Sequence, residues 1–178
     1  MKVLAIFTCY NRRELTRQSM ELLGQNKNVT FDYVIVNDGS TDGTDEMLAA
    51  MPYEIDLING DGGLFWNRGM YEAIEHAKKV HPDYEYYMLM NDDTKFVPGI
   101  FDEMLPLFAP DKVMVGAMCG DDGRMSYGGI KYVKGIKYKK YGPEAQDICF
   151  DTFNANCAVI PQIGRAQSEL QSLHSISY

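Results

Sequence analysis

Three clusters of polar side chains stand directly after short apolar runs of the chain, and the third carries adjacent carboxylates. Asp92 and Asp93 follow Asn91 at the end of the run YMLM. Carboxylates at the end of a rigid strand can hold a hard divalent cation, because Mg2+ is commonly bound by one or two carboxylates together with substrate phosphates. Such a cation acts as a Lewis acid toward a departing diphosphate. The alternative is a solvated turn at the end of a strand.

The other two clusters have residue types that suit a nucleotide. Asn37, Asp38 and Gly39 follow the run VIV, and a carboxylate in this place can accept a hydrogen bond from a base or a ribose. The turn residues after them begin a helix, for which Thr41 or Asp42 is better suited as a cap than as a ligand. The first cluster contains four residues that follow the first apolar run: Thr8, Tyr10, Asn11 and Arg12.

The elements that position these clusters can be predicted from hydrophobic periodicity. Strands are predicted over residues 3–8, 33–36, 53–58, 84–90 and 113–119. Four helices are predicted between these strands: one after Asn11, one that ends at Ala50, one around Met70 and one after Pro98. Asn11 and Glu14 resemble a capping box at the start of the first helix.

Strands that alternate with helices predict an α/β fold with a mainly parallel sheet and helices on both faces. Ligands of such folds bind beyond the carboxyl ends of the strands, so we expect the three clusters to face one site. After residue 120 repeated glycines and the segment 131–138 predict a small antiparallel or irregular part. We expect one domain over 1–178, with a nucleotide-binding half (1–95), the rest of the sheet and the acceptor side (96–161), and an atypical tail (162–178).

Composition excludes several classes of protein. The net charge of -8 gives little electrostatic support for non-specific nucleic-acid binding. No apolar run is long enough to span a membrane, and the N-terminus fits a buried strand and not a signal peptide. The first strand is followed by neither a P-loop motif nor the glycine-rich motif of dinucleotide-binding enzymes, so both classes of enzyme are disfavoured. The cysteines have no metal-binding spacing, and we expect buried free thiols at Cys9, Cys119, Cys149 and Cys157.

A group of lysines is concentrated in ten residues of the later part of the chain. Its members are Lys131, Lys134, Lys137, Lys139 and Lys140. A solvated edge hairpin protected by lysines is the favoured interpretation. The alternative is peripheral contact with an anionic membrane surface or a phosphorylated lipid.

Several motifs in the same order resemble those of family 2 glycosyltransferases of the GT-A type. They are TCYNRRELT, VIVNDGSTDGT, GDGGLFWNRGMYEAIEHA, YMLMNDDT, SYGGI and FDTFNANCAVIP. The resemblance extends from Met1 to about Pro161. It is strongest with the branch that includes rhamnosyl- and galactosyl-transferases of bacterial surface polysaccharides.

The resemblance implies a binding site for a UDP- or dTDP-sugar donor. Thr8 and Tyr10 would hold or stack on the pyrimidine, with Arg12 nearby. Asp38 would accept a hydrogen bond from the base N3–H, and Arg68 would approach the phosphates.

The resemblance also implies a role for the carboxylates of the third cluster. Asp92 would bind the ribose, and Asp93 would ligate Mg2+ or Mn2+. Asp61 is a candidate contact of the donor sugar or phosphate. Trp66 either borders the donor sugar or packs in the core. Asn91 replaces the first acid of the usual motif and could still coordinate through its carbonyl oxygen.

The reaction implied by the family is transfer with inversion to a glycan or lipid-linked acceptor. This would occur at the cytoplasmic face of a bacterial membrane. A carboxylate base is expected after the Asn-x-Asn segment, but the tail has one acid, Glu169, and no such motif, so the catalytic base is unassigned. The alternative is an inactive fragment that binds nucleotide-sugar. Apolar sheet surface left by missing C-terminal helices would favour a homodimer.

Overall fold

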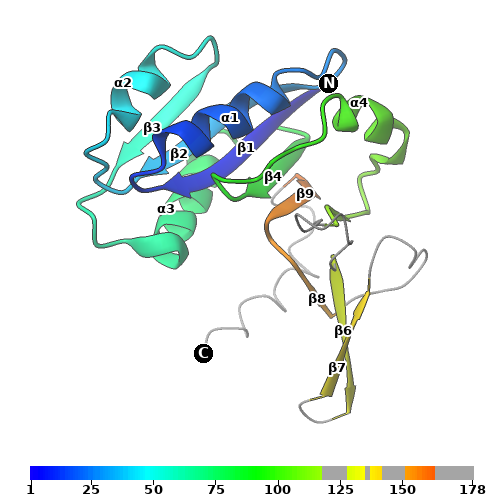
Figure 1. Cartoon of the computed structure of the whole chain (residues 1–178). Coiled ribbons are helices and arrows are strands. Elements are labelled where there is room, and N and C mark those ends of the chain that lie inside the picture. Colours follow the sequence, from blue (N-terminus) through cyan, green and yellow to red (C-terminus); the bar gives the residue numbers. More distant parts are fainter. Residues whose placement is uncertain (118–127, 135–136, 142–150, 163–178) are drawn as a thin grey trace.

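A six-stranded sheet forms the centre of the protein, and its strands are ordered β3-β2-β1-β4-β9-β5 (Figure 1). This computed structural model describes residues 1–117, 128–134, 137–141 and 151–162. The strands of the sheet are β1 (Lys2–Cys9), β2 (Thr30–Asn37), β3 (Ile55–Asn59), β4 (Tyr86–Met90), β5 (Met114–Val115) and β9 (Cys157–Pro161).

Strand direction changes within this sheet. β1 pairs in parallel with β2 and β4, and β2 pairs in parallel with β3. β9 runs antiparallel to both β4 and β5. The start of β9 therefore lies beside the carboxyl end of β4, where Met90 is paired with Cys157. Side chains just before β9 consequently reach the same edge of the sheet as those that follow β1, β2 and β4.

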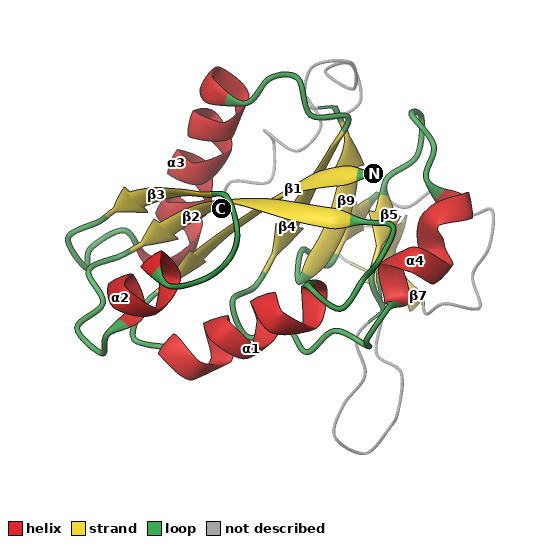
Figure 2. Ribbon diagram, turned by 90° about the horizontal axis from the view of Figure 1, so that it is seen from above, coloured by secondary structure: helices red, strands yellow, loops and turns green. Residues whose placement is uncertain are grey.

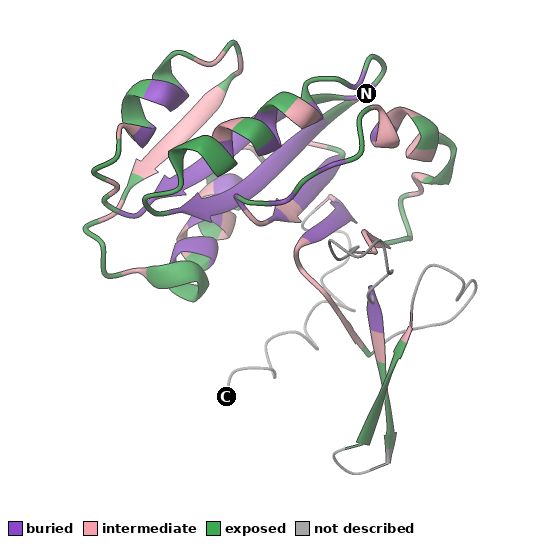
Figure 3. Ribbon diagram, in the orientation of Figure 1, coloured by how far each residue is buried: buried purple, intermediate pink, exposed green. Residues whose placement is uncertain are grey.

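Helices cover both faces of the sheet, as predicted. α1 (Arg13–Leu23), α2 (Thr44–Ala49) and α4 (Ile100–Met104) lie on one face, and α3 (Phe65–Val80) lies on the other (Figure 2). Alternate residues of β1 point to opposite faces. Val3, Ala5 and Phe7 belong to the core under α1, whereas Leu4 and Ile6 belong to the core under α3. The central strands are buried on both sides (Figure 3).

The predicted cap of α1 is wrong. Asn11 has a left-handed backbone, φ 50°, and its side-chain oxygen accepts a hydrogen bond from Thr41 N–H at 2.7 Å. The first N–H of α1, that of Arg13, instead donates to Asp42 Oδ2 at 2.9 Å, and Asp42 Oδ1 accepts from Thr44 at the start of α2. Glu14 pairs with Arg17 and completes no capping box. Asp42 thus accepts the first N–H of both helices, as a capping residue does, although it stands one residue before Gly43, the N-cap of α2.

The predicted antiparallel part is a second sheet with the strand order β7-β6-β8. Its strands are β6 (Gly129–Lys134), β7 (Lys137–Tyr141) and β8 (Thr152–Phe153). The hairpin of β6 and β7 extends away from the main sheet (Figure 1). Its lysines at 131, 137, 139 and 140 are exposed, which agrees with a solvated hairpin.

Two of the predicted buried thiols are confirmed. Cys9 and Cys157 are buried and free, and burial raises the pKa of each thiol to about 12. Cys119, Cys149, Glu169 and part of the SYGGI motif lie outside the described residues. Within the described ranges, no helix is long and apolar enough to cross a bilayer.

Side chains of two distant segments cap each other where α4 meets the loop after α1. The buried Asn26 side-chain oxygen accepts hydrogen bonds from Phe101 N–H at 2.9 Å and Asp102 N–H at 3.2 Å. In return, the Asp102 carboxylate accepts hydrogen bonds from the backbone N–H groups of Lys27, Asn28 and Val29, at 2.7, 2.8 and 3.3 Å. The short α4 helix is thereby held to the sheet.

The carboxylate of Asp102 makes stability depend on pH. Backbone donors hold the pKa of Asp102 below its ordinary value. The contribution of Asp102 to the free energy of unfolding is therefore complete above the unfolded pKa of about 3.9. It is lost as pH falls through the lower pKa of the folded state. We expect Asp102→Asn to lower the urea midpoint at pH 7 and to flatten its decline between pH 5 and pH 2. Asp111→Asn, at an exposed position, is the control, and equal slopes in D102N and wild type would contradict the assignment.

Candidate functional site

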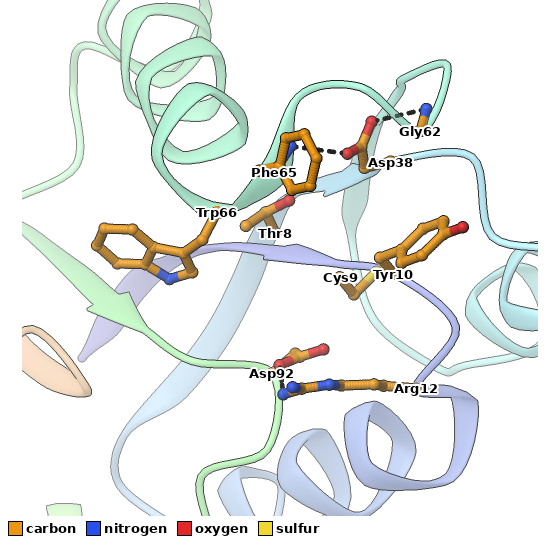
Figure 4. Close-up of a pocket in the computed structure, with 9 residues that line it drawn as sticks. All are labelled: Thr8, Cys9, Tyr10, Arg12, Asp38, Gly62, Phe65, Trp66 and Asp92. Atoms are coloured by element: carbon orange, nitrogen blue, oxygen red, sulfur yellow. Dashed lines mark hydrogen bonds and ion pairs between the residues drawn. The ribbon is translucent and has the colours of Figure 1, made fainter.

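A pocket of about 240 Å3 lies at the carboxyl ends of β1, β2 and β4 (Figure 4). Its lining residues are Thr8, Cys9, Tyr10, Arg12, Asp38, Gly62, Phe65, Trp66 and Asp92. The three polar clusters of the sequence each contribute to it, because parallel strands end at one edge of the sheet. Tyr10 and Trp66 lie on opposite sides of the pocket, with Arg12 and Asp92 below them in the view of Figure 4.

Asp38 holds the loop that leads into α3. Its side chain is only 3% exposed and accepts three backbone hydrogen bonds. Gly62 N–H donates to Oδ1 at 2.9 Å, while the N–H groups of Leu64 and Phe65 donate to Oδ2 at 3.0 and 2.9 Å. A carboxylate has about four acceptor sites, so roughly one remains for a ligand. The contact between Asp38 and a base stays a prediction, and the contact with the loop is a second role that the sequence did not indicate.

Glycine is required where this loop meets the end of β2. A Cβ on Gly60 would lie 2.5 Å from Asp38 Oδ1, and one on Gly39 would lie 2.9 Å from the nitrogen of Gly62. Gly39 and Gly62 also have positive φ values of 72° and 89°, which side chains other than glycine adopt with strain. The loop can therefore approach Asp38 closely enough for its N–H groups to reach the carboxylate.

Phe65 is a pocket residue that the sequence analysis missed. Its backbone φ is 53°, a strained conformation for a bulky residue, and the residue is 77% exposed. The hydrogen bond from its N–H to Asp38 fixes this conformation. Such strain costs of order 1–3 kcal/mol and is found mostly at functional sites. No pattern in the sequence predicts the strained backbone of Phe65. Its aromatic residue type does not distinguish it from the neighbouring Trp66.

Arg12 is the one cation among the residues that line the pocket. Its Nη1 lies 3.2 Å from Asp92 Oδ1 and 2.7 Å from Asp93 Oδ2. Asp92 is buried, and burial raises its pKa to about 6, while the Arg12 guanidinium opposes the rise. Asp93 is half-exposed and lies next to the pocket. The structure thus brings together three residues that were predicted to lie at the donor site: Arg12, Asp92 and Asp93.

Trp66 is part of the pocket wall and not of the core. Its side chain is 49% exposed, and its indole N–H donates to Asn91 Oδ1 at 3.0 Å. The amide nitrogen of Asn91 donates in turn to Asn156 Oδ1 at 2.9 Å. The carbonyl oxygen of Asn91, expected to be free for a cation, is therefore engaged by Trp66.

The structure brings two of the predicted donor-binding residues to other places. Arg68 is exposed, forms an ion pair with Glu72 at 2.7 Å and lies over the ring of Tyr71. It does not line the pocket, because two residues of helix turn it away from the face that carries Trp66. Asp61 accepts the N–H of Gly63 within its own loop and also does not line the pocket.

Thr8 lies where α3 crosses the end of β1. Its hydroxyl donates to the carbonyl oxygen of Val36 at 3.2 Å, so it can serve a ligand only as an acceptor. A Cβ on Gly69 would lie 2.5 Å from the Thr8 hydroxyl, so α3 can approach β1 only with glycine in this position. This close crossing brings the first turn of α3, with Phe65 and Trp66, to the mouth of the pocket.

A divalent cation fits the donor set in one way. Within the described ranges, no three His, Cys, Asp or Glu side chains form a metal cage. Asp93, beside Asp92, instead suits Mg2+ or Mn2+ held by one or two carboxylates and completed by ligand phosphates. Arg12 supplies the positive charge at this point in the structure.

Comparison with known proteins shows the family. Residues 5–159 match the model of glycosyl transferase family 2. The chain belongs to this family. The predicted family and fold class are thereby confirmed, and comparison with curated proteins finds no significant match.

Solved structures of glycosyltransferases share the fold. Residues 1–349 of S. aureus TarS are 17% identical, with a TM-score of 0.60, and the match covers 98% of this chain and 49% of that one. The mannosyltransferase PcManGT from Pyrobaculum calidifontis, in complex with GDP-Man and Mn2+, is 16% identical with a TM-score of 0.57. That match covers 96% of this chain and 46% of the mannosyltransferase. The chain therefore spans about half the length of these structures.

Proposed function

We propose that this member of the family binds a UDP- or dTDP-sugar in the pocket at the ends of β1, β2 and β4. The sugar would then pass to a glycan or lipid-linked acceptor by direct displacement with inversion. The proposal includes a role in bacterial polysaccharide synthesis at the inner face of the membrane. The proposal also includes peripheral contact of the protein with that membrane and assembly of the protein as a homodimer.

The observation that carries the proposal is the position of Arg12 between two carboxylates. A guanidinium in a pocket can form two parallel hydrogen bonds to a phosphate, which makes it suited to a diphosphate. Asp92 and Asp93 lie within 3.2 Å of the same guanidinium nitrogen. A nucleotide diphosphate with a bound cation would supply both charges that this arrangement needs, a negative one for Arg12 and a positive one for the carboxylates.

The chemistry expected of a bound Mg2+ or Mn2+ is neutralisation of the leaving diphosphate. Asp93 would hold the cation, since its carboxylate is the more accessible of the two. Asp92, which is buried, would orient the ribose. Tyr10, exposed at the opposite side of the pocket from Trp66, offers an aromatic face for the base (Figure 4).

Calorimetric titration with UDP and dTDP, with and without Mn2+, tests the proposal. We expect binding that depends on Mn2+, and we expect Asp93→Asn to weaken it about tenfold or more, because the carboxylate that would hold the cation is lost. Asp61→Asn is the matched control, since Asp61 does not line the pocket. Equal binding by D93N and wild type in the presence of Mn2+ would remove Asp93 from the site.

A second candidate function is donor binding without transfer. It is favoured by the state of the two carboxylates that line the pocket, since Asp38 accepts three backbone hydrogen bonds and Asp92 is paired with Arg12. Neither is free to act as a base. Release of free nucleotide diphosphate from UDP-galactose or dTDP-rhamnose in the presence of acceptor would reject this candidate.

A further inference from the structure

Three polar side chains form a relay from the pocket to the segment before β9. Trp66, in the first turn of α3, donates its indole N–H to Asn91 at the end of β4, and Asn91 donates to Asn156. An indole is a donor only, so Asn91 must present its oxygen to Trp66 and its nitrogen to Asn156. Asn156 must then present its oxygen. The chemistry of Trp66 thus fixes the orientation of both amides.

The far end of the relay is anchored to backbone. The backbone carbonyl oxygen of Asn156 accepts hydrogen bonds from the backbone N–H of Asn91 at 3.2 Å and from the Thr94 hydroxyl at 3.1 Å. Asn156 N–H donates to Asn154 Oδ1 at 3.0 Å. The side-chain oxygen that receives Asn91 therefore belongs to a residue whose backbone is held on both sides.

Relay geometry also explains the residue type at position 91. An aspartate is only an acceptor, so it could accept from Trp66 but could not donate to Asn156 Oδ1, and the Asn156 amide would have to turn over to pair with it. An amide does both at once. The asparagine that replaces the first acid of the usual motif therefore fits a role in holding Trp66.

The held ring forms one end wall of the pocket. Tyr10 lies at the other end, and the Arg12 guanidinium and Asp92 lie below the space between the two aromatic residues in Figure 4. If a diphosphate is bound at Arg12 and a base at Tyr10, the sugar of the donor extends toward Trp66. An aromatic wall binds a ligand through shape and contact area, so the angle of the indole determines which sugar ring fits against it.

We propose that Asn91 and Asn156 are positioning residues that set the Trp66 ring against the donor sugar and thereby determine sugar specificity. This inference rests on the proposed function, because it needs a nucleotide-sugar in the pocket. It concerns the sugar and not the nucleotide, which is bound by other residues.

Substitutions at Asn156 separate the relay from general structure. Asn156→Asp keeps an acceptor for the Asn91 amide, whereas Asn156→Leu removes it. Thr94→Val is the matched control, because it removes one side-chain hydrogen bond to the Asn156 backbone, which Asn91 N–H and Asn154 still hold, and it leaves the side-chain relay intact. Trp66 is the sole tryptophan of the chain, so its fluorescence reports directly on the ring.

Two measurements are made on each variant of the 178-residue chain. The first is the emission spectrum of Trp66, and the second is the affinity for UDP-galactose relative to UDP and for dTDP-rhamnose relative to dTDP. We expect N156L to shift the emission and to lower the relative affinity for the nucleotide-sugar that wild type prefers about fivefold, the equivalent of one net hydrogen bond. N156D and T94V should match wild type in both measurements.

Three outcomes would overturn the inference. N156D could behave like N156L, T94V could produce the same changes as N156L, or N156L could bind both ligands as wild type does. Should N156L fail to fold, N156D and Asn91→Leu provide the same comparison. Failure of every protein, wild type included, to bind UDP or dTDP would instead reject the proposed function and the specificity claim with it, whatever the emission spectra show.

Discussion

Asp38→Asn is expected to lower the free energy of unfolding by about 1–3 kcal/mol, because it leaves a part-buried backbone N–H next to a buried side chain without an acceptor. The carboxylate accepts from Gly62 on one oxygen and from Leu64 and Phe65 on the other. An asparagine has one acceptor oxygen, so its NH2 group would face a backbone donor on one side. The change in the urea midpoint measures the loss.

The same substitution distinguishes two roles of Asp38. If it holds the loop, D38N lowers stability and nucleotide affinity together, since Gly62, Phe65 and Trp66 lose their positions. If it contacts only the base, nucleotide affinity falls while the urea midpoint stays at the wild-type value. Asp61→Asn is the control in the same loop, and we expect it to change stability by less than about 0.5 kcal/mol.

Arg12→Ala is expected to weaken UDP or dTDP binding about 10- to 100-fold, the value of a charge-assisted hydrogen bond to a phosphate. Arg12 is the cation that lines the pocket, and its removal also leaves Asp92 and Asp93 without their counter-ion. Arg12→Lys keeps the charge but not the planar fork, so an intermediate loss is expected. Calorimetric titration in the presence of Mn2+ measures each affinity.

Arg68→Ala is the control for this experiment. Arg68 was expected from the sequence to approach the phosphates, but it pairs with Glu72 on the exposed face of α3. We expect a change in affinity below about twofold, as for other surface substitutions. A loss as large as that of R12A would return Arg68 to the donor site. Thermal unfolding of both variants would show whether the fold is intact.

The sequence was sufficient to predict the edge of the sheet at which the pocket lies. Thr8, Asp38 and Asp92 each follow a buried strand, and parallel strands bring such residues together whatever the details of the loops. Helix spacing could also have indicated that Arg68 does not share a face with Trp66, since Trp66 and Met70 are four residues apart on one face and Arg68 lies midway between them in sequence. That inference needed only the helical period.

Contacts between distant loops could not be predicted from the sequence. The cap of α1 comes from Asp42 and not from Asn11, because Asn11 adopts a left-handed backbone that local preference does not require. In the same way, the engagement of Asp38 by the loop before α3 and of Asn91 by Asn156 depends on segments that meet only in the folded chain. Local sequence constrains a residue's neighbours, whereas these partners are set by topology.

The antiparallel addition of β9 to β4 has a consequence for the order of folding. β1, β2 and β3 are joined by short crossovers through α1 and α2, whereas Asn156 reaches Asn91 across 65 residues of chain. Closing a long loop costs more chain entropy and slows the formation of contacts. We therefore expect the side of the pocket formed by the ends of β1 and β2 to assemble early and the wall held by Asn156 to assemble last.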